Sequence, residues 1–193
     1  VCKHFPGHGS VISDSHITMP ISHRAYDALK CKDLKPFIEL INKDLLNAIM
    51  PAHVTYKAVD AKKPAGFSTT WLQKILRNEL GFKGLVLSDC LSMTGADIGN
   101  LMTRTEEALS AGCDMLIVCH QPRTVLLELL QTITFKQLPE SAARIISFKN
   151  QMLRFADPEK KQLPASVYNS LQEHQELSAS NTPNAQFNTT QTI

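Results

Sequence analysis

The hydrophobic positions of the chain alternate between helical spacing and the continuous runs of buried strands from residue 34 to about residue 155. In the first stretch apolar side chains recur at i, i+3, i+4 and i+7, which predicts an amphipathic helix over residues 34–45. Asp33 is placed to cap this helix, and Pro36 stands in its first turn, where a missing N–H costs nothing. We therefore expect a helix capped by Asp33 that buries one face.

A short strand and a second amphipathic helix follow. The apolar run 48–50 ends at Pro51, which indicates a buried strand. Ser68 can cap the next helix, whose apolar residues over 71–80 form one face. Gly81 ends that helix at a position where a left-handed backbone is needed.

The same alternation continues through the second half of the chain. Strands are expected at 84–89 and 115–119, and helices at about 103–111, 124–132 and 139–155, the first of which closes at Gly112. Continuous apolar strands separated by helices indicate a parallel sheet that is covered on both faces. The predicted fold class is α/β, with parallel strands alternating with helices.

The chain changes character at its C-terminal end. Residues 177–193 contain no charged residue and are rich in Ser, Thr, Asn and Gln. Such a stretch cannot bury enough surface to offset the entropy lost on ordering. We expect a folded domain over residues 1–156 and a polar tail over 157–193 that is largely disordered from about residue 177.

Composition excludes several classes of protein. With 43% hydrophobic and 20% charged residues the chain is globular in character. Twenty Lys+Arg against eighteen Asp+Glu leave a net charge of +2, too balanced to favour a nucleic-acid partner. No apolar run reaches the roughly 20 residues that span a bilayer. The five cysteines are scattered without a CxxC pair, which argues against a disulfide scaffold or a zinc ribbon and favours a reducing compartment.

The densest polar cluster is KHFPGHGS at residues 3–10, followed by Asp14 and His16. Its proline and two glycines indicate a loop rather than a regular element. Three histidines so close together could bind a metal, serve in acid/base chemistry, or simply face solvent in a turn. Asp14 and His16 lie two residues apart, so their side chains share a face of an extended loop. A carboxylate there can fix the tautomer of the imidazole and leave its other nitrogen for a substrate.

A second group of polar residues stands at the ends of the predicted strands. Asp89 lies at the carboxyl end of an apolar run, where open α/β sheets and barrels place their reactive groups. It could act as nucleophile, general base, metal ligand or helix cap. His53 and His120 stand at corresponding strand ends, and each taken alone could be structural. Cys90 has no neighbouring positive charge in sequence to activate a thiol, which argues against a thiol nucleophile.

These strings resemble a known family. Residues 3–9 (KHFPGHG) with residues 14–16 (DSH) closely resemble the signature loop of bacterial β-N-acetylglucosaminidases of glycoside hydrolase family three. Residues 50–54 (MPAHV) and 87–93 (LSDCLSM) are similar to the next two motifs of that family, in the same order. The resemblance covers about residues 1–155.

The resemblance implies a retaining exo-glycosidase on a (β/α)8 TIM barrel. Asp89 matches the nucleophile that forms a covalent glycosyl-enzyme, and His16 matches the general acid/base, with Asp14 as its partner in a dyad. The family members most similar release N-acetylglucosamine from muropeptide fragments in the cytoplasm during cell-wall recycling. The resemblance therefore implies a small carbohydrate substrate.

The resemblance also implies how the sugar is held. Lys3 and His4 match residues that bind the hydroxyls of N-acetylglucosamine, and we expect His53 to contact substrate as well. No metal and no cofactor is expected, and the full-length protein is expected to be a monomer that binds neither nucleic acid nor membrane. Cys90 departs from the family, whose members often carry an acidic or small residue there, and we expect it to tune function rather than abolish it.

Length suggests that part of the barrel is missing. A complete (β/α)8 barrel takes about 250 residues, whereas this chain offers about 155 outside its tail. The chain also opens on Val1, without an initiator methionine. We expect the C-terminal part of a barrel, truncated at its N-terminus, with the end of one strand and three further strand–helix units. Such a fragment is expected to be inactive or aggregation-prone on its own.

Two alternatives stay open. One is a glycoside phosphorylase of the same family, because a histidine acid does not repel an incoming phosphate as a carboxylate would. The other is a metal-binding hydrolase or a non-catalytic remnant that binds sugar.

Overall fold

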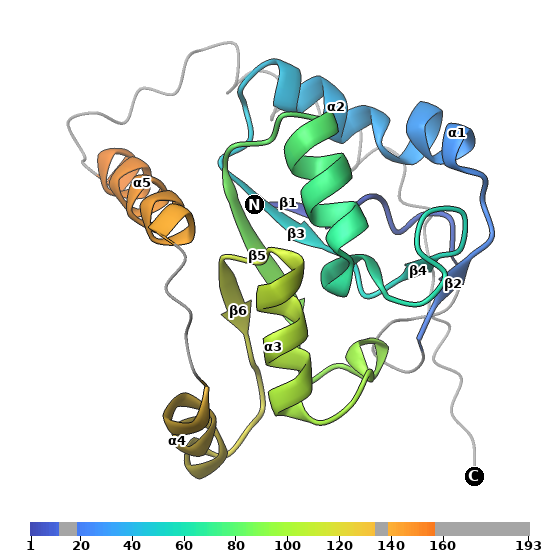
Figure 1. The fold of residues 1–193 in the computed structure, drawn as a ribbon. Coiled ribbons are helices and arrows are strands. Elements are labelled where there is room, and N and C mark those ends of the chain that lie inside the picture. Colours follow the sequence, from blue (N-terminus) through green and yellow to red (C-terminus); the bar gives the residue numbers. More distant parts are fainter. Residues whose placement is uncertain (12–18, 134–138, 157–193) are drawn as a thin grey trace, which may run out of the picture. The chain divides into compact units, whose positions relative to one another are not determined.

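The computed structural model describes residues 1–11, 19–133 and 139–156 (Figure 1). Residues 1–150 form one compact unit. The strands are β1 (Cys2–Phe5), β2 (Ile21–Ser22), β3 (Ala48–Pro51), β4 (Thr55–Tyr56), β5 (Leu85–Cys90) and β6 (Met115–Ile117). The α-helices are α1 (Tyr26–Ala28), α2 (Lys35–Asn42), α3 (Leu101–Ala111), α4 (Arg123–Thr132) and α5 (Pro139–Ala156). Shorter or wider helical segments are η1 (Leu29–Asp33), η2 (Ala65–Phe67), η3 (Thr70–Glu79) and η4 (Thr94–Ala96).

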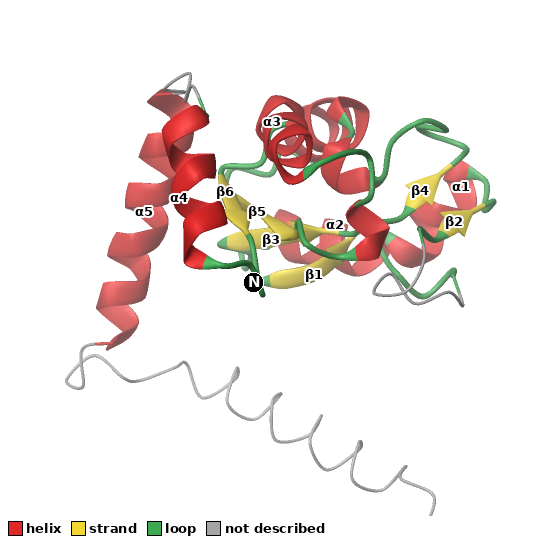
Figure 2. Cartoon of the chain, turned by 90° about the horizontal axis from the view of Figure 1, so that it is seen from below, coloured by secondary structure: helices red, strands yellow, loops and turns green. Residues whose placement is uncertain are grey.

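Four of these strands form a parallel sheet in chain order, β1-β3-β5-β6. In Figure 2 they lie as neighbouring arrows that run the same way. Helical segments separate each strand from the next, and α3 packs against η2, η3 and β6. Parallel strands that are adjacent in both sequence and space, with helices between them, are the repeating unit of a (β/α) barrel. The predicted α/β class and its alternation of strands and helices are confirmed.

A second, smaller ladder stands beyond the end of β3. In it β2 pairs with β4 in parallel, with Ile21 opposite Thr55 and Ser22 opposite Tyr56. Sequence pattern did not predict these strands, because two residues are too few to show a period. This ladder connects the chain that follows the first loop to the chain that follows β3.

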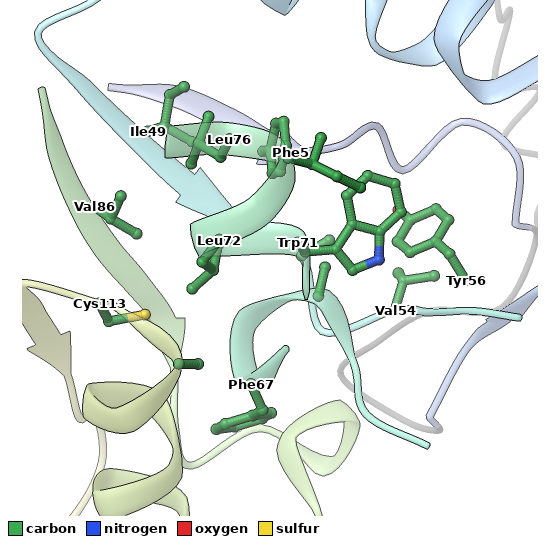
Figure 3. Close-up of a cluster of buried hydrophobic side chains, with 14 of the residues drawn as sticks. Phe5, Ile49, Val54, Tyr56, Phe67, Trp71, Leu72, Leu76, Val86 and Cys113 are labelled. Carbon is green, nitrogen blue, oxygen red and sulfur yellow. The ribbon is translucent and has the colours of Figure 1, made fainter. Parts of the chain in front are cut away.

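The core is built around one cluster of aromatic rings (Figure 3). The Trp71 indole of η3 meets Phe5 of β1 edge to face at 5.8 Å and Tyr56 of β4 at 5.3 Å, measured between ring centroids. Phe37 of α2 meets the other side of Phe5 at 5.4 Å. All four side chains are buried. Each such pair contributes about 0.5–1.5 kcal/mol beyond the burial of its area, so the cluster fixes β1 against two later helices.

The predicted cap of the first helix is wrong. Asp33 is the last residue of η1, and its carboxylate accepts a hydrogen bond from Arg24 Nη1 at 2.5 Å. Leu34, which precedes α2, already has helical backbone angles and carries no side-chain cap. Because the chain is helical on both sides of Leu34, α2 has no free amino end there and needs no cap.

The predicted loop over residues 3–10 begins later than expected. Its first three residues belong to β1, which pairs in parallel with β3, and the chain leaves the sheet only at Pro6. The helix ends were predicted correctly: Gly81 and Gly112 have φ of +69° and +118°, which favour glycine. Ser68 also accepts the amide N–H of Trp71 at 3.3 Å, as its predicted capping role requires.

Among the described residues, no helix combines the length and the hydropathy needed to cross a bilayer.

Candidate active site

The carboxyl end of the parallel sheet brings an imidazole and a carboxylate together. His4 lies near the end of β1 and Asp89 near the end of β5, on either side of β3. His4 Nε2 and Asp89 Oδ2 are 3.6 Å apart, and the two side chains remain 30% and 14% exposed. A base and a carboxylate within reach of one another and of solvent at this edge can bind a small polar ligand between them.

The second carboxylate oxygen of Asp89 is held by the backbone. Asp89 Oδ1 accepts the amide N–H of Cys90 at 2.7 Å. A hydrogen bond to an ionised group is stronger than a neutral one, so this contact fixes the carboxylate and leaves Oδ2 facing His4. The Cys90 peptide is therefore part of the structure of the site.

His53 contacts the carbonyl group of the same residue, Cys90. Its Nε2 lies 3.1 Å from the Cys90 carbonyl oxygen, and because a carbonyl can only accept, Nε2 carries the proton. The ring is 1% exposed and stacks on Phe67 at 5.2 Å, and its Nδ1 has no hydrogen-bond partner among the described residues. Burial lowers the pKa of His53, although the negative charge of Asp89 acts in the opposite direction. His53 is thus a neutral, buried support for Cys90.

We expect His53 to make the folded state sensitive to mild acid. Because the pKa of His53 is lower in the folded protein than in the unfolded chain, the unfolded chain binds the extra proton as pH falls below about 6.5. The free energy of unfolding then falls by up to about 1.4 kcal/mol for each pH unit below that value. Urea unfolding between about pH 7.5 and about pH 5.5 should show a smaller loss for His53→Gln than for the wild type. The exposed His23, changed to Gln, is the matched control, and equal pH slopes for wild type and His53→Gln would contradict the assignment.

The loop that follows β1 is anchored at both ends of its described part. The Tyr56 hydroxyl donates to the Gly7 carbonyl at 2.6 Å, and the Ser10 and Ser22 hydroxyls are hydrogen-bonded at 3.1 Å. Gly7 has a φ of +134°, and a Cβ there would approach Asp33 to 2.7 Å, so only glycine fits this turn. The β2–β4 ladder therefore fixes the start of the loop that carries the predicted acid/base residues.

The predicted acid/base dyad itself lies outside the described residues. Asp14 and His16 both fall within residues 12–18, so their roles stay predictions. The described loop adds one histidine next to the site: His8 meets the ring of His4 edge to face, with 6.0 Å between centroids.

The other predicted site residues are placed as follows. Lys3 is exposed on β1 beside His4, and His120 is exposed after β6 with a φ of +56°. His53 is buried behind Asp89 rather than on an open surface. The predicted contacts of Lys3, His4 and His53 with substrate stay predictions.

Sequence analysis missed the role of Cys90. The sequence argued against a thiol nucleophile and predicted only that Cys90 tunes function, whereas its backbone N–H holds Asp89 and its sulfur accepts the amide N–H of Cys119 at 3.3 Å. The only signal in the sequence was its position directly after Asp89.

Within residues 1–11, 19–133 and 139–156, no three His, Cys, Asp or Glu side chains are close enough together to hold a metal ion.

The fold and the site define the class of the protein. A parallel sheet in chain order with an aspartate and a histidine at its carboxyl edge is the arrangement of a (β/α)-barrel protein whose reactive groups lie at the strand ends. The profile of the glycosyl hydrolase family 3 N terminal domain matches residues 1–148. The chain belongs to this family.

Two relatives of this chain are named beta-hexosaminidase. A beta-hexosaminidase of Methylobacillus flagellatus is 49% identical over 146 residues, which are 75% of this chain and 41% of the relative. A beta-hexosaminidase of Idiomarina loihiensis is 49% identical over 152 residues, 78% of this chain and 44% of the relative. The chain thus spans less than half the length of these curated relatives.

Solved structures agree with the fold. The structure of NagZ from Neisseria gonorrhoeae in complex with N-trifluoroacetyl-D-glucosamine has a TM-score of 0.66 and 41% identity, and the match covers 76% of this chain and 41% of that one. A glycoside hydrolase family 3 β-N-acetylglucosaminidase from a Paenibacillus species has a TM-score of 0.69 and 33% identity, over 77% of this chain and 30% of that one.

Proposed function

We propose that the whole protein is a retaining exo-β-N-acetylglucosaminidase in which Asp89 is the nucleophile and His16, oriented by Asp14, is the general acid/base. The observation that carries the proposal is the pairing of His4 with the backbone-held Asp89 carboxylate at the carboxyl edge of the sheet. Relatives of this chain named beta-hexosaminidase, and a solved relative named β-N-acetylglucosaminidase, support the substrate class.

The first chemical step makes a bond to Asp89. Oδ2 of the carboxylate attacks the anomeric carbon as the bond to the aglycone breaks, and His16 gives its proton to the departing oxygen. The hydrogen bond from Cys90 N–H leaves one carboxylate oxygen turned toward the open side, where the sugar enters. The product of this step is a glycosyl-enzyme ester and the free aglycone.

The second step reverses the roles. The neutral imidazole of His16 takes a proton from water, the water oxygen attacks the anomeric carbon, and the ester bond to Asp89 breaks. Two inversions give overall retention. A histidine has a reference pKa near 6.5, so it can donate and recover a proton around neutrality without the raised pKa that a carboxylic acid would need.

The remaining groups bind and position the sugar. His4 presents its imidazole beside Asp89, and Lys3 precedes it on β1 as an exposed donor; both groups are suited to the hydroxyls of N-acetylglucosamine. His53 supports Asp89 through the Cys90 peptide, and this buried support is the role that its 1% exposure favours over a direct substrate contact. The proposed substrates are muropeptide fragments, in a cytoplasmic cell-wall recycling role of a monomeric enzyme.

His16 should be tested by its dependence on the leaving group. His16→Ala removes the proton donor, so hydrolysis of N-acetylglucosaminides with poor leaving groups should fall by roughly 100-fold or more, the scale of general acid catalysis. Aryl glycosides with a nitrophenolate leaving group need little proton donation and should lose far less in the glycosylation step. The measurement is kcat/KM across a series of leaving groups, with the exposed His23 changed to Ala as the control. Equal losses for all leaving groups would overturn the assignment.

The same assay separates hydrolysis from phosphorolysis. If the second substrate is water, turnover in phosphate buffer equals turnover in an inert buffer of the same ionic strength, and free N-acetylglucosamine is the product. Formation of a sugar phosphate would favour a phosphorylase of the same family instead.

A further inference from the structure

Two cysteines meet where β5 and β6 end. The amide N–H of Leu91 donates to the Ile117 carbonyl at 2.9 Å, which is the last bond of the ladder between the two strands. One step further on, the N–H of Cys119 turns to the Cys90 sulfur instead, at 3.3 Å. The Cys119 nitrogen is bonded to the Cα of that residue, so the Cys119 side chain begins close to the Cys90 sulfur.

The two thiols interact with each other. The pKa of Cys119 is raised mainly because its thiol donates a hydrogen bond to the Cys90 sulfur, with smaller contributions from burial and from Asp89. The amide N–H of Cys119 on the Cys90 sulfur is the contact that brings the two side chains together. Two thiols that lie side by side are the arrangement in which an oxidised sulfur meets a second thiol that can close a disulfide.

Another cysteine in the core lacks these features. Cys113 is buried, burial raises its pKa to about 12, and its sulfur faces the Gly66 carbonyl at 3.7 Å. Cys90 and Cys119 are both half-buried at the rim of the site.

We propose that Cys90 and Cys119 are a site of reversible oxidation, at which a hydroperoxide closes a disulfide beside Asp89. The Cys90 thiolate attacks the peroxide, takes one oxygen to become a sulfenic acid, and releases water or an alcohol with the displaced oxygen. The Cys119 sulfur then attacks the sulfenic sulfur, and the hydroxyl leaves as water. Two thiols are oxidised and one hydroperoxide is reduced, and two equivalents of a small thiol reverse the change.

The disulfide would act on the site through the backbone of Cys90. The Cys90 N–H holds Asp89, and the Cys90 carbonyl accepts from His53. A disulfide fixes the two sulfurs at about 2.05 Å with a dihedral angle near 90°, so closing it moves the Cys90 side chain and, with it, the peptide that orients Asp89. This effect on turnover rests on the proposed function, whereas formation of the bond does not.

Peptide mapping tests formation of the bond directly. The protein is treated with hydrogen peroxide, free thiols are blocked with an alkylating reagent, and tryptic peptides are analysed without reduction. Cleavage after Lys83, Arg104 and Arg123 puts Cys90 alone in the peptide 84–104 and Cys119 in the peptide 105–123. The expected product is these two peptides joined with the loss of two hydrogen atoms, and its disappearance on reduction.

Variants identify the partner, because Cys113 shares the second peptide. Cys119→Ser and Cys90→Ser should each abolish the cross-linked product, while the exposed Cys31→Ser should leave it unchanged. A cross-link that survives in Cys119→Ser would overturn the proposal, as would quantitative alkylation of both thiols after peroxide treatment of a folded wild-type protein.

Activity measurements test the consequence separately. Peroxide-treated wild-type protein should lose at least about 10-fold in hydrolysis of an aryl N-acetylglucosaminide and recover it with a small thiol, while Cys119→Ser should keep its activity through the same treatment. If the cross-link forms and activity is unchanged, the coupling to Asp89 is refuted. These activity measurements use the whole protein, and a failure of the glycosidase proposal itself would show as no hydrolysis by the untreated whole protein, with the cross-link still formed.

Discussion

Changing Asp89 to alanine should abolish turnover of every glycoside, whatever its leaving group. Without the carboxylate no covalent intermediate forms, and the loss in kcat should be on the order of 10^4-fold or more, the scale on which removing a nucleophile lowers the activity of other hydrolases. That factor corresponds to about 5.4 kcal/mol of transition-state stabilisation. The result contrasts with His16→Ala, whose effect depends on the leaving group, and the contrast separates the two roles.

The experiment compares kcat on an aryl and an alkyl N-acetylglucosaminide. The exposed Asp27 changed to Ala is the matched control, since it removes a carboxylate of the same kind far from the described site in sequence. Added azide, a small anion that fits the space of the lost carboxylate, should restore part of the activity of Asp89→Ala and give a glycosyl azide. Retention of more than a tenth of wild-type kcat without azide would refute the nucleophile assignment.

The largest expected effect on stability comes from Asp114, at the start of β6. Its side chain is 0% exposed and pairs with Arg77 Nη2 at 2.8 Å and with Arg144 at 2.9 Å. It also accepts the amide N–H of Val86 at 2.9 Å and the Ser141 hydroxyl at 2.6 Å. Removing one partner of a buried ion pair leaves the other charge uncompensated, so Asp114→Ala should lower the free energy of unfolding by about 3–5 kcal/mol.

Urea unfolding followed by circular dichroism measures this loss. The control is Asp97→Ala, because Asp97 pairs with Arg104 at 2.7 Å but is 62% exposed. A surface pair contributes about 0–1 kcal/mol, so the control should change the midpoint little. Similar losses for the two variants would mean that burial does not set the strength of the Asp114 network.

Sequence pattern was sufficient for three of the four strands of the main sheet and for its main helices, whereas β1 was predicted as part of a loop. Strands buried on both faces leave continuous apolar runs, and helices packed on a sheet leave a regular apolar face, so both are visible in one dimension. The left-handed backbone that ends two of the helices could also be predicted, because a glycine follows each of them, at Gly81 and Gly112. The cap at Asp33 was mispredicted because a sequence does not show that the preceding residues are already helical.

The arrangement of the site could be predicted only in part from the sequence. That Asp89 stands at the carboxyl edge of the sheet follows from its position after an apolar run, and the approach of His4 follows once the strands are known to be parallel. The contacts of Cys90 with His53 and Cys119 depend on which residues face each other across strands. The register between β5 and β6 shifts between Leu87 and Cys90, and such a shift leaves no mark in the hydrophobic pattern.

The order of the strands has a consequence for how the chain is made. Each later strand of the main sheet pairs with the strand of that sheet synthesised before it, because β1, β3, β5 and β6 lie side by side in chain order. A ribosome delivers residues at about 5–20 per second, which is slow beside the microseconds to milliseconds in which local elements form. Every new strand therefore emerges next to a finished template, and the sheet can grow from one side during translation without waiting for distant segments.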